Sequence, residues 1–151
     1  MKTSMPAIPD PVTAQGARVL VVDDELAARE SLTELLSTLG HVVVDAVATA
    51  EDAEARAREL HPDAILLDVH LPGANGIDAA QAISRALPGV AIVLISGDDT
   101  IQLTDAEAEA SGAVAFLPKP VPPRVLDSTI RLAVARTGAL RQARQEAADL
   151  K

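Results

Sequence analysis

The chain has 151 residues, close to the usual length of one domain, and 48% of them are hydrophobic. It contains no Cys, which excludes disulfides and thiolate metal sites and is typical of the cytoplasm, where we expect the protein to reside. The net charge of −9 argues against direct binding of nucleic acid, and no apolar run is long enough to cross a membrane.

The first part of the chain shows no pattern of regular structure. Residues 1–17 contain three Pro and a single Lys and lack an apolar core segment, so they do not form a secretory signal. We expect residues 1–17 to be a flexible N-terminal leader, residues 18–135 to form the folded domain, and residues 136–151 to form a helical extension.

Short continuous apolar runs, each bounded by polar or turn residues, predict buried strands of a parallel sheet. The predicted strands are Val19–Val22, Val42–Val44, Ala64–Leu67, Ile92–Ile95 and Ala113–Leu117.

Segments with helical periodicity lie between and after these runs, and several of them end at Gly or Pro, which are common after the last turn of a helix. The predicted helices are Glu25–Leu39, Glu51–Leu60, Ile77–Leu87, Thr100–Ser111 and a last one from Pro122 to at least Ala135. Five strands alternating with five helices predict an α/β fold, a doubly wound five-stranded parallel sheet flanked by five helices on its two faces.

Polar residues follow the strands at the point where each one ends. Asp23 and Asp24 follow the first strand, Asp68 follows the third, Ser96 the fourth and Lys119 the fifth. All parallel strands deliver their carboxyl ends to one edge of the sheet, where open α/β folds bind ligands. The sequence therefore predicts a site at this edge.

Three carboxylates in one pocket repel each other unless a cation compensates their charge. An all-oxygen ligand set suits Mg²⁺, with Mn²⁺ as the other candidate, and no His or Cys cluster favours zinc. A carboxylate beside such an ion can attack phosphorus, and Lys119 and Ser96 offer an ammonium and a hydroxyl for the phosphoryl oxygens.

The motifs that carry these residues resemble the receiver domain of two-component response regulators. They are Val-Val-Asp-Asp-Glu at 21–25, Leu-Leu-Asp-Val-His-Leu-Pro-Gly at 66–73 with Gly76 following, Ile-Ser-Gly at 95–97, and Phe-Leu-Pro-Lys-Pro at 116–120. The resemblance covers residues 18 to 135 and implies the flavodoxin-like receiver fold.

The resemblance also implies roles for the acidic residues. Asp68 corresponds to the phosphoacceptor, Asp24 to a direct Mg²⁺ ligand, and Asp23 to a ligand that acts largely through water. The backbone carbonyl of His70 would complete the coordination by the protein, while the His70 imidazole faces solvent.

The remaining positions correspond to a conformational switch. Ser96 resembles the switch hydroxyl, Phe116 the switch aromatic residue and Lys119 the lysine that binds the phosphoryl group. Family resemblance further implies a cis bond between Lys119 and Pro120, a form that costs little only before proline.

By this resemblance the chain is a regulatory phosphoacceptor, not an enzyme beyond its own phosphorylation and dephosphorylation. The donor would be a sensor histidine kinase or a phosphotransfer protein. Phosphorylation would change the face formed by 100–111, 113–117 and 122–135 and so control a partner or a homodimer formed through that face and the C-terminal helix.

Other interpretations of the same residues exist. Asp23 and Asp24 are suited to cap the following helix. A strand-end Asp nucleophile is also found in phosphatases of the haloacid dehalogenase type, but His70 stands where they need a second Asp. A receiver that only docks without phosphorylation is disfavoured by the complete acidic set. His41 and His61 are interpreted as ordinary loop or helix-end residues.

The tail leaves two interpretations open. A repeat of apolar residues every seven positions predicts a long last helix, either a short coiled coil or a solvated helix; it comprises Leu126, Ala133, Leu140 and Ala147. The tail and residues 94–101 resemble receivers of sigma-54-dependent activators, and similar tails precede RNA-binding antiterminator helices. The chain is thus a single-domain regulator or a fragment of a longer transcription or RNA-binding regulator.

Overall fold

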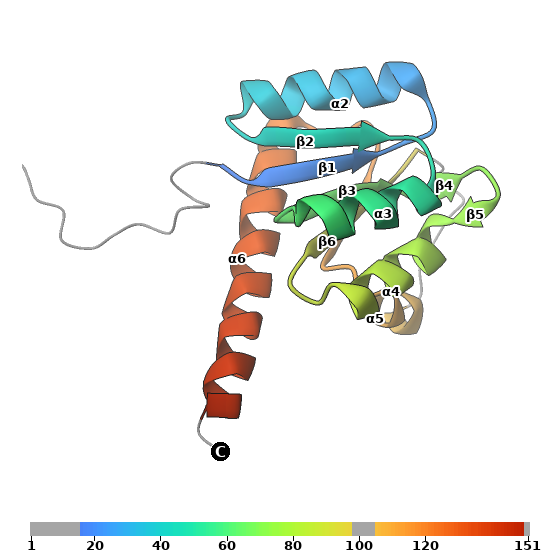
Figure 1. Cartoon of the computed structure of the whole chain (residues 1–151). Coiled ribbons are helices and arrows are strands. Elements are labelled where there is room, and N and C mark those ends of the chain that lie inside the picture. Colours follow the sequence, from blue (N-terminus) through green and yellow to red (C-terminus); the bar gives the residue numbers. More distant parts are fainter. Residues whose placement is uncertain (1–15, 98–104, 150–151) are drawn as a thin grey trace, which may run out of the picture.

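The computed structural model describes residues 16–97 and 105–149 of the chain (Figure 1). Its main sheet has five parallel strands in the order β2-β1-β3-β6-β7. These strands are β1 (Arg18–Val22), β2 (Val42–Val47), β3 (Ala64–Asp68), β6 (Ala91–Ser96) and β7 (Ala115–Pro118). The predicted doubly wound sheet is confirmed.

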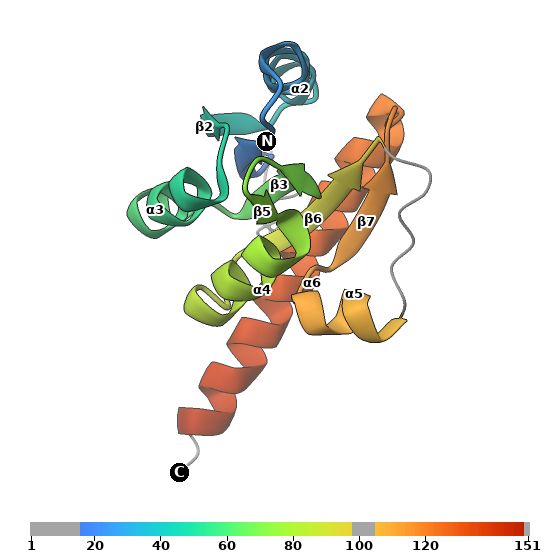
Figure 2. The ribbon, with the colours of Figure 1, turned by 90° about the vertical axis from the view of Figure 1, so that its right-hand side faces the viewer.

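The described residues form five helices, also as predicted (Figure 2). They are α2 (Leu26–Thr38), α3 (Ala50–Leu60), α4 (Gly76–Ala86), α5 (Asp105–Ser111) and α6 (Pro123–Asp149). Helices α2 and α6 lie on one face of the sheet, and α3 and α4 lie on the other. No helix of the described residues is long and apolar enough to cross a membrane.

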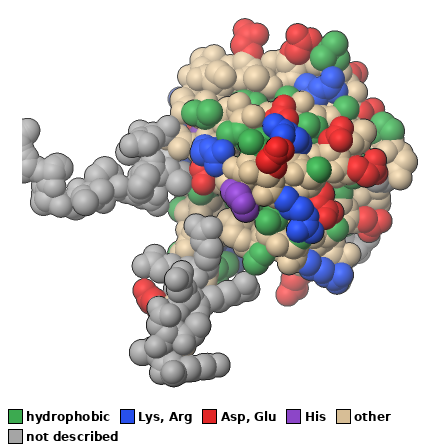
Figure 3. All heavy atoms as spheres, in the orientation of Figure 1, with side chains coloured by type: hydrophobic (Ala, Val, Ile, Leu, Met, Phe, Trp, Pro, Cys, Tyr) green, Lys and Arg blue, Asp and Glu red, His purple; other side chains and the backbone are tan. Residues whose placement is uncertain are grey.

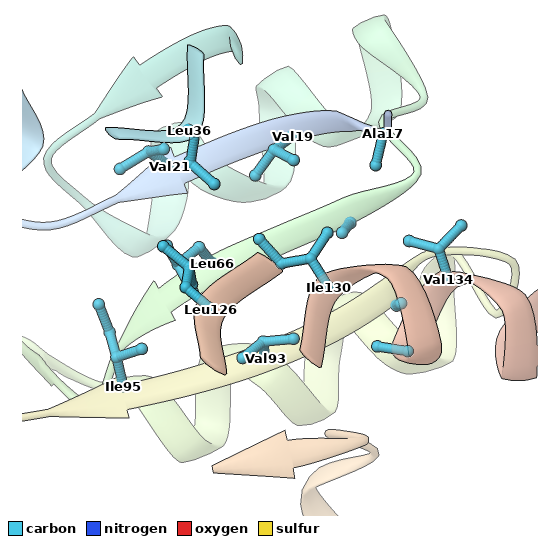
Figure 4. Packing of buried hydrophobic residues seen from close by; sticks show 13 residues of the cluster. Ala17, Val19, Val21, Leu36, Leu66, Val93, Ile95, Leu126, Ile130 and Val134 are labelled. Carbon is cyan, nitrogen blue, oxygen red and sulfur yellow. The ribbon is translucent and has the colours of Figure 1, made fainter. Parts of the chain in front are cut away.

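The first half of the core lies between the sheet and helices α2 and α6 (Figure 4). Leu126 and Ile130 of α6 project onto Val93 of β6, the strand next to the central strand β3, and are almost completely buried. Burying a side chain of this size stabilises the fold by about 1.5–3 kcal/mol. The first part of α6 is therefore an integral part of the domain.

The second half of the core lies under α3 and α4. Ala53 and Ala57 of α3 are small enough to bring that helix close to the sheet, and Ile83 of α4 fills the adjacent space. Phe116 of β7, the only aromatic residue, is partly buried at the edge of this cluster. Aliphatic side chains therefore form nearly all of both halves.

A two-stranded hairpin was not predicted. Strands β4 (His70–Leu71) and β5 (Ala74–Asn75) pair in antiparallel fashion directly after β3. Two residues per strand are too few to show a period of two, so no sequence pattern marks these strands. This hairpin places the start of α4 beside the end of β3.

The predicted boundaries differ from the observed ones in places. Strand β2 continues to Val47 rather than Val44, and the last strand begins at Ala115 rather than Ala113. The predicted helix 100–111 is seen as α5 over Asp105–Ser111, and its first residues lie outside the described part of the chain. Helix α6 extends without interruption past residue 135, which confirms the predicted long last helix.

His41 is not the ordinary loop residue that the sequence led us to expect. It lies in the loop before β2 as expected, but it is buried, and its Nδ1 accepts a hydrogen bond from the N–H of Ala17 at 2.9 Å. Its Nε2 lies 2.8 Å from Oδ1 of Asp127 on α6, and the same oxygen accepts a hydrogen bond from Arg131. Ala17, which we placed in the leader, is likewise buried. This network links the start of β1 to the last helix.

Candidate functional site

The three predicted carboxylates meet at the carboxyl edge of the sheet. Asp23 directly follows β1 and Asp68 is the last residue of β3, the strand that pairs with β1. Both are buried, with 1% and 6% of their surface exposed, whereas Asp24 is exposed. The site therefore has a buried acidic floor and one carboxylate open to solvent.

Lys119 lies directly over this floor. The peptide bond from Lys119 to Pro120 is cis, as predicted, and the Lys119 N–H donates to the carbonyl of Ser96 at 2.8 Å. The Lys119 ammonium donates to Oδ2 of Asp23 at 2.8 Å and to Oδ2 of Asp68 at 3.0 Å. One cation thus bridges two carboxylates that belong to different strands.

The second oxygen of Asp68 is held by the chain that follows it. Oδ1 of Asp68 accepts a hydrogen bond from the N–H of His70 at 2.8 Å. Gly76 packs against the same turn so closely that a Cβ atom there would lie 2.3 Å from the Asp68 carbonyl oxygen. Asp68 is therefore fixed from both sides, by Lys119 and by the β4–β5 hairpin.

Burial and neighbouring charges shift the pKa values of Asp68 and Lys119 in opposite directions. Burial raises the pKa of Asp68, although the His70 N–H and the Lys119 ammonium oppose the increase. Burial alone lowers the pKa of Lys119, but its contacts with Asp23 and Asp68 outweigh that effect and the pKa is raised overall. Lys119 therefore remains an ammonium at neutral pH and offsets part of the repulsion between the carboxylates.

The acidic cluster fits a divalent cation. Asp23, Asp24 and Asp68 each offer a carboxylate oxygen, and these oxygens all lie within 4.8 Å of one another. A hard cation such as Mg²⁺ prefers oxygen ligands and keeps several of its waters, which suits a site that is open on the Asp24 side. These three residues would hold the ion.

The other predicted residues lie around the cluster. Ser96 ends β6 in a buried position beside the end of β7, and His70 is exposed as expected. Phe116 lies on β7 opposite Leu94 of β6, partly buried. The roles predicted for Ser96, Phe116 and the His70 carbonyl remain predictions.

Two hydrogen bonds that hold Asp23 in place were not predicted from the sequence. The Arg29 side chain donates to the Asp23 carbonyl at 2.8 Å, and the N–H of Glu25 donates to Oδ1 of Asp23 at 2.9 Å. The second bond closes a local turn ahead of α2, whose N-cap is Glu25 with no side-chain capping hydrogen bond, so the helix-cap interpretation of the two aspartates is not borne out. No pattern in the sequence pointed to the contribution of Arg29.

Several known proteins are similar to this chain in sequence. The family model of the response regulator receiver domain matches residues 19–131. The chain is 33% identical over 114 residues to the chemotaxis protein CheY of Thermotoga maritima, a match that covers 75% of this chain and 94% of that protein. It is 37% identical over 122 residues to the transcriptional regulatory protein PdtaR of Mycobacterium tuberculosis, which covers 79% of this chain but only 57% of PdtaR.

Solved structures agree with these sequence matches. A CheY-like response regulator receiver domain from Methanospirillum hungatei superimposes with a TM-score of 0.71 at 28% identity, over 80% of this chain and 94% of that one. The NtrX structure from Brucella abortus matches 89% of this chain with a TM-score of 0.67 at 30% identity, but only 30% of the NtrX chain is covered. The chain belongs to the response regulator receiver family of two-component signalling systems.

Proposed function

We propose that the domain accepts a phosphoryl group on Asp68 from a phosphohistidine of a sensor histidine kinase or phosphotransfer protein. The observation that carries this proposal is the bridging of Asp23 and Asp68 by Lys119 beside the exposed Asp24. It brings a carboxylate nucleophile, a metal ligand set and a fixed positive charge to one edge of the sheet.

In the transfer, a carboxylate oxygen of Asp68 bonds to phosphorus while the bond from phosphorus to the histidine nitrogen breaks. The imidazole keeps the electron pair of that bond. The Lys119 ammonium, 3.0 Å from Oδ2 of Asp68, is placed to contact the phosphoryl oxygens as negative charge develops on them. Asp23, Asp24, Asp68 and the His70 carbonyl would hold Mg²⁺, or Mn²⁺ in its place, and such an ion would supply further positive charge for the phosphoryl oxygens.

The test is phosphate incorporation from a small phosphodonor with and without EDTA. We expect incorporation into the unmodified chain with Mg²⁺, and none after the Asp68→Asn substitution or after chelation. The matched control is Asp52→Asn, which makes the same change at an exposed residue of α3. Incorporation that persists in Asp68→Asn would disprove the assignment of the acceptor.

The switch is the second part of the proposal. When Ser96 contacts the phosphoryl group, Phe116 would move inward and alter the face formed by α5, β7 and α6. Residues 98–104, between Ser96 and α5, lie outside the described part of the chain. Identical amide spectra of this face with and without beryllofluoride would exclude the switch.

For output we propose self-association of the phosphorylated form through this face and α6. Val125 and Leu132 of α6 are exposed to 42% and 70%, so the helix has apolar surface to offer a second copy. Light scattering of the full chain with and without beryllofluoride tests this, and a monomer in both states would exclude it.

A second candidate for output is a role as the receiver part of a longer regulator. The match covers only 57% of PdtaR and 30% of NtrX, so these relatives contain substantial sequence beyond the receiver. In that case phosphorylation of this domain would act on an adjoining domain rather than on a second copy. The length of the coding sequence in the transcript and the mass of the native protein distinguish self-association from action on an adjoining domain.

A further inference from the structure

A groove of about 370 Å³ runs between helices α3 and α4, on the sheet face opposite α6. Its floor is apolar, with accessible surface contributed by Ala50, Ala79 and Ala82, and carboxylates line it at Glu51, Glu54 and Asp78. We call this surface the acidic groove. Figure 3 shows that Asp and Glu side chains are frequent on this face of the molecule.

Some carboxylates of the acidic groove have no cationic partner among the described residues. Glu54 pairs with Arg58 one turn further along α3, at 3.0 Å. Within the described residues, Glu51 and Asp78 have no cationic partner. Both lie in the first turn of a helix, where a carboxylate is favourable for the helix dipole. The dipole explains each residue separately, but both carboxylates line the same groove without a cation of the described residues to neutralise them.

A metal ion does not fit this surface. Among the described residues, the only group of three or more side chains close enough to share an ion is the cluster of Asp23, Asp24 and Asp68. The carboxylates of the acidic groove are therefore too dispersed for one cation. They suit several cationic groups carried on a chain, with apolar groups between them to cover the floor.

We propose that the acidic groove is a docking surface for a basic, amphipathic segment of a partner protein. Lys or Arg side chains of that segment pair with Glu51 and Asp78, and small apolar side chains lie against Ala79 and Ala82. Charge complementarity of this kind gives specificity and speeds association, and the net charge of −9 attracts a basic partner from a distance.

The groove is physically connected to the phosphoacceptor. Gly73 and Asn75 of the β4–β5 hairpin line one end of it. Asn75 pairs with His70 in the hairpin, and its side chain accepts from the N–H of Ile77 at 2.7 Å at the start of α4. The His70 N–H in turn donates to Asp68.

A phosphoryl group on Asp68 would change the oxygen that accepts this bond and thereby displace the hairpin at the end of the groove. We therefore infer that phosphorylation alters the affinity of the acidic groove for the basic segment. This coupling rests on the proposed function, whereas the docking surface itself does not.

Fluorescence anisotropy with a labelled short peptide of alternating Lys and Leu tests the docking surface on the full, unphosphorylated chain. The groove variant combines Glu51→Gln with Asp78→Asn. The control variant combines Glu30→Gln with Glu34→Gln on the exposed side of α2 and changes the net charge equally. We expect binding about tenfold weaker for the groove variant and unchanged for the control.

Two further measurements guard against a charge effect or a folding defect. A Lys and Ser peptide should bind more weakly than the Lys and Leu peptide, because it cannot cover the apolar floor. Ala82→Lys adds a repelling charge at an exposed position of the groove, outside the first turn of α4, and should weaken binding as well. Equal losses in the groove and control variants, or equal binding of the two peptides, would overturn the docking surface.

The coupling is tested by repeating the titration with beryllofluoride and recording amide spectra in parallel. We expect the affinity to change severalfold and the amides of Ala79 and Ala82 to shift. Shifts around Asp68 with no change in affinity would overturn the coupling alone. If beryllofluoride shifts no amide around Asp68 while the peptide still binds, the phosphoacceptor proposal fails and the docking surface stands.

Discussion

Replacing Gly76 with Ala tests the packing that supports Asp68, the proposed phosphoacceptor. A Cβ atom at residue 76 would lie 2.3 Å from the Asp68 carbonyl oxygen and 2.6 Å from Cα of Val69. Real Cβ atoms essentially never come within 3.0 Å of a heavy atom outside their own and the adjoining residues, so the start of α4 or the end of β3 must move by about 0.7 Å or more. Because both contacts are with backbone, no side chain can rotate away to relieve them.

The expected destabilisation follows from this crowding. Overpacking of a buried position costs about 1–3 kcal/mol, and contacts with backbone place Gly76→Ala near the upper end of that range. Gly138→Ala is the matched control, since a Cβ there would meet nothing within 4 Å in the middle of α6. In a helix interior Ala is favoured over Gly, so this variant should gain about 0.5–1 kcal/mol.

Urea unfolding followed by circular dichroism measures both changes, since the chain has no Trp or Tyr for fluorescence. Mg²⁺ titrations of the same variants followed by amide shifts report on the acidic cluster. We expect weaker Mg²⁺ binding only in Gly76→Ala, because Asp68 moves with the displaced backbone. If the two variants unfold at the same urea concentration, the crowding at Gly76 has no energetic weight and the reasoning is refuted.

Three more predictions concern the core and the titrating groups. Leu126→Ala should cost about 2–5 kcal/mol in urea unfolding because the side chain is completely buried, whereas Leu132→Ala, 70% exposed, should change stability by less than about 0.5 kcal/mol. Burial raises the pKa of Asp127, but hydrogen bonds from Arg131 and from the imidazole it contacts outweigh burial and lower the pKa overall. Asp127→Asn should therefore destabilise the protein at neutral pH. The difference in the free energy of unfolding between this variant and the unmodified chain should disappear as the pH falls through the lowered pKa of Asp127. A difference that is independent of pH would contradict this prediction. Burial raises the pKa of Asp68. The Mg²⁺ affinity, measured by calorimetry, should therefore fall as the pH is lowered through this raised pKa, because protons then compete with the ion for the carboxylate. An affinity that is constant over this range would argue against Asp68 as a ligand.

The sheet and the composition of the site could be predicted from the sequence alone. Continuous apolar runs mark strands buried on both faces, and because such strands are parallel, all their carboxyl ends lie at one edge. Asp23, Asp68 and Lys119 could therefore be assigned to the same edge once the strands were recognised, whereas their distances depend on the strand order, which only the structure shows. The same local patterns located the helices to within a few residues.

The contacts that give these residues their properties could not be predicted in this way. The ammonium of Lys119 bridges Asp23, 96 residues earlier in the chain, and Asp68, 51 residues earlier. His41 is linked to Asp127 across 86 residues. No periodicity in the sequence reports which side chains face each other across such separations.

Tertiary structure alone also decided the details that lie next to the site. The β4–β5 hairpin is too short for a pattern, and the need for Gly at residue 76 arises from the approach of α4 to the end of β3. The acidic groove exists because α3 and α4 pack side by side on one face of the sheet. Local propensity determines which elements form, but packing determines the distances between them. Those distances set the pKa values, the spacing of the three carboxylates and the surfaces that the molecule exposes.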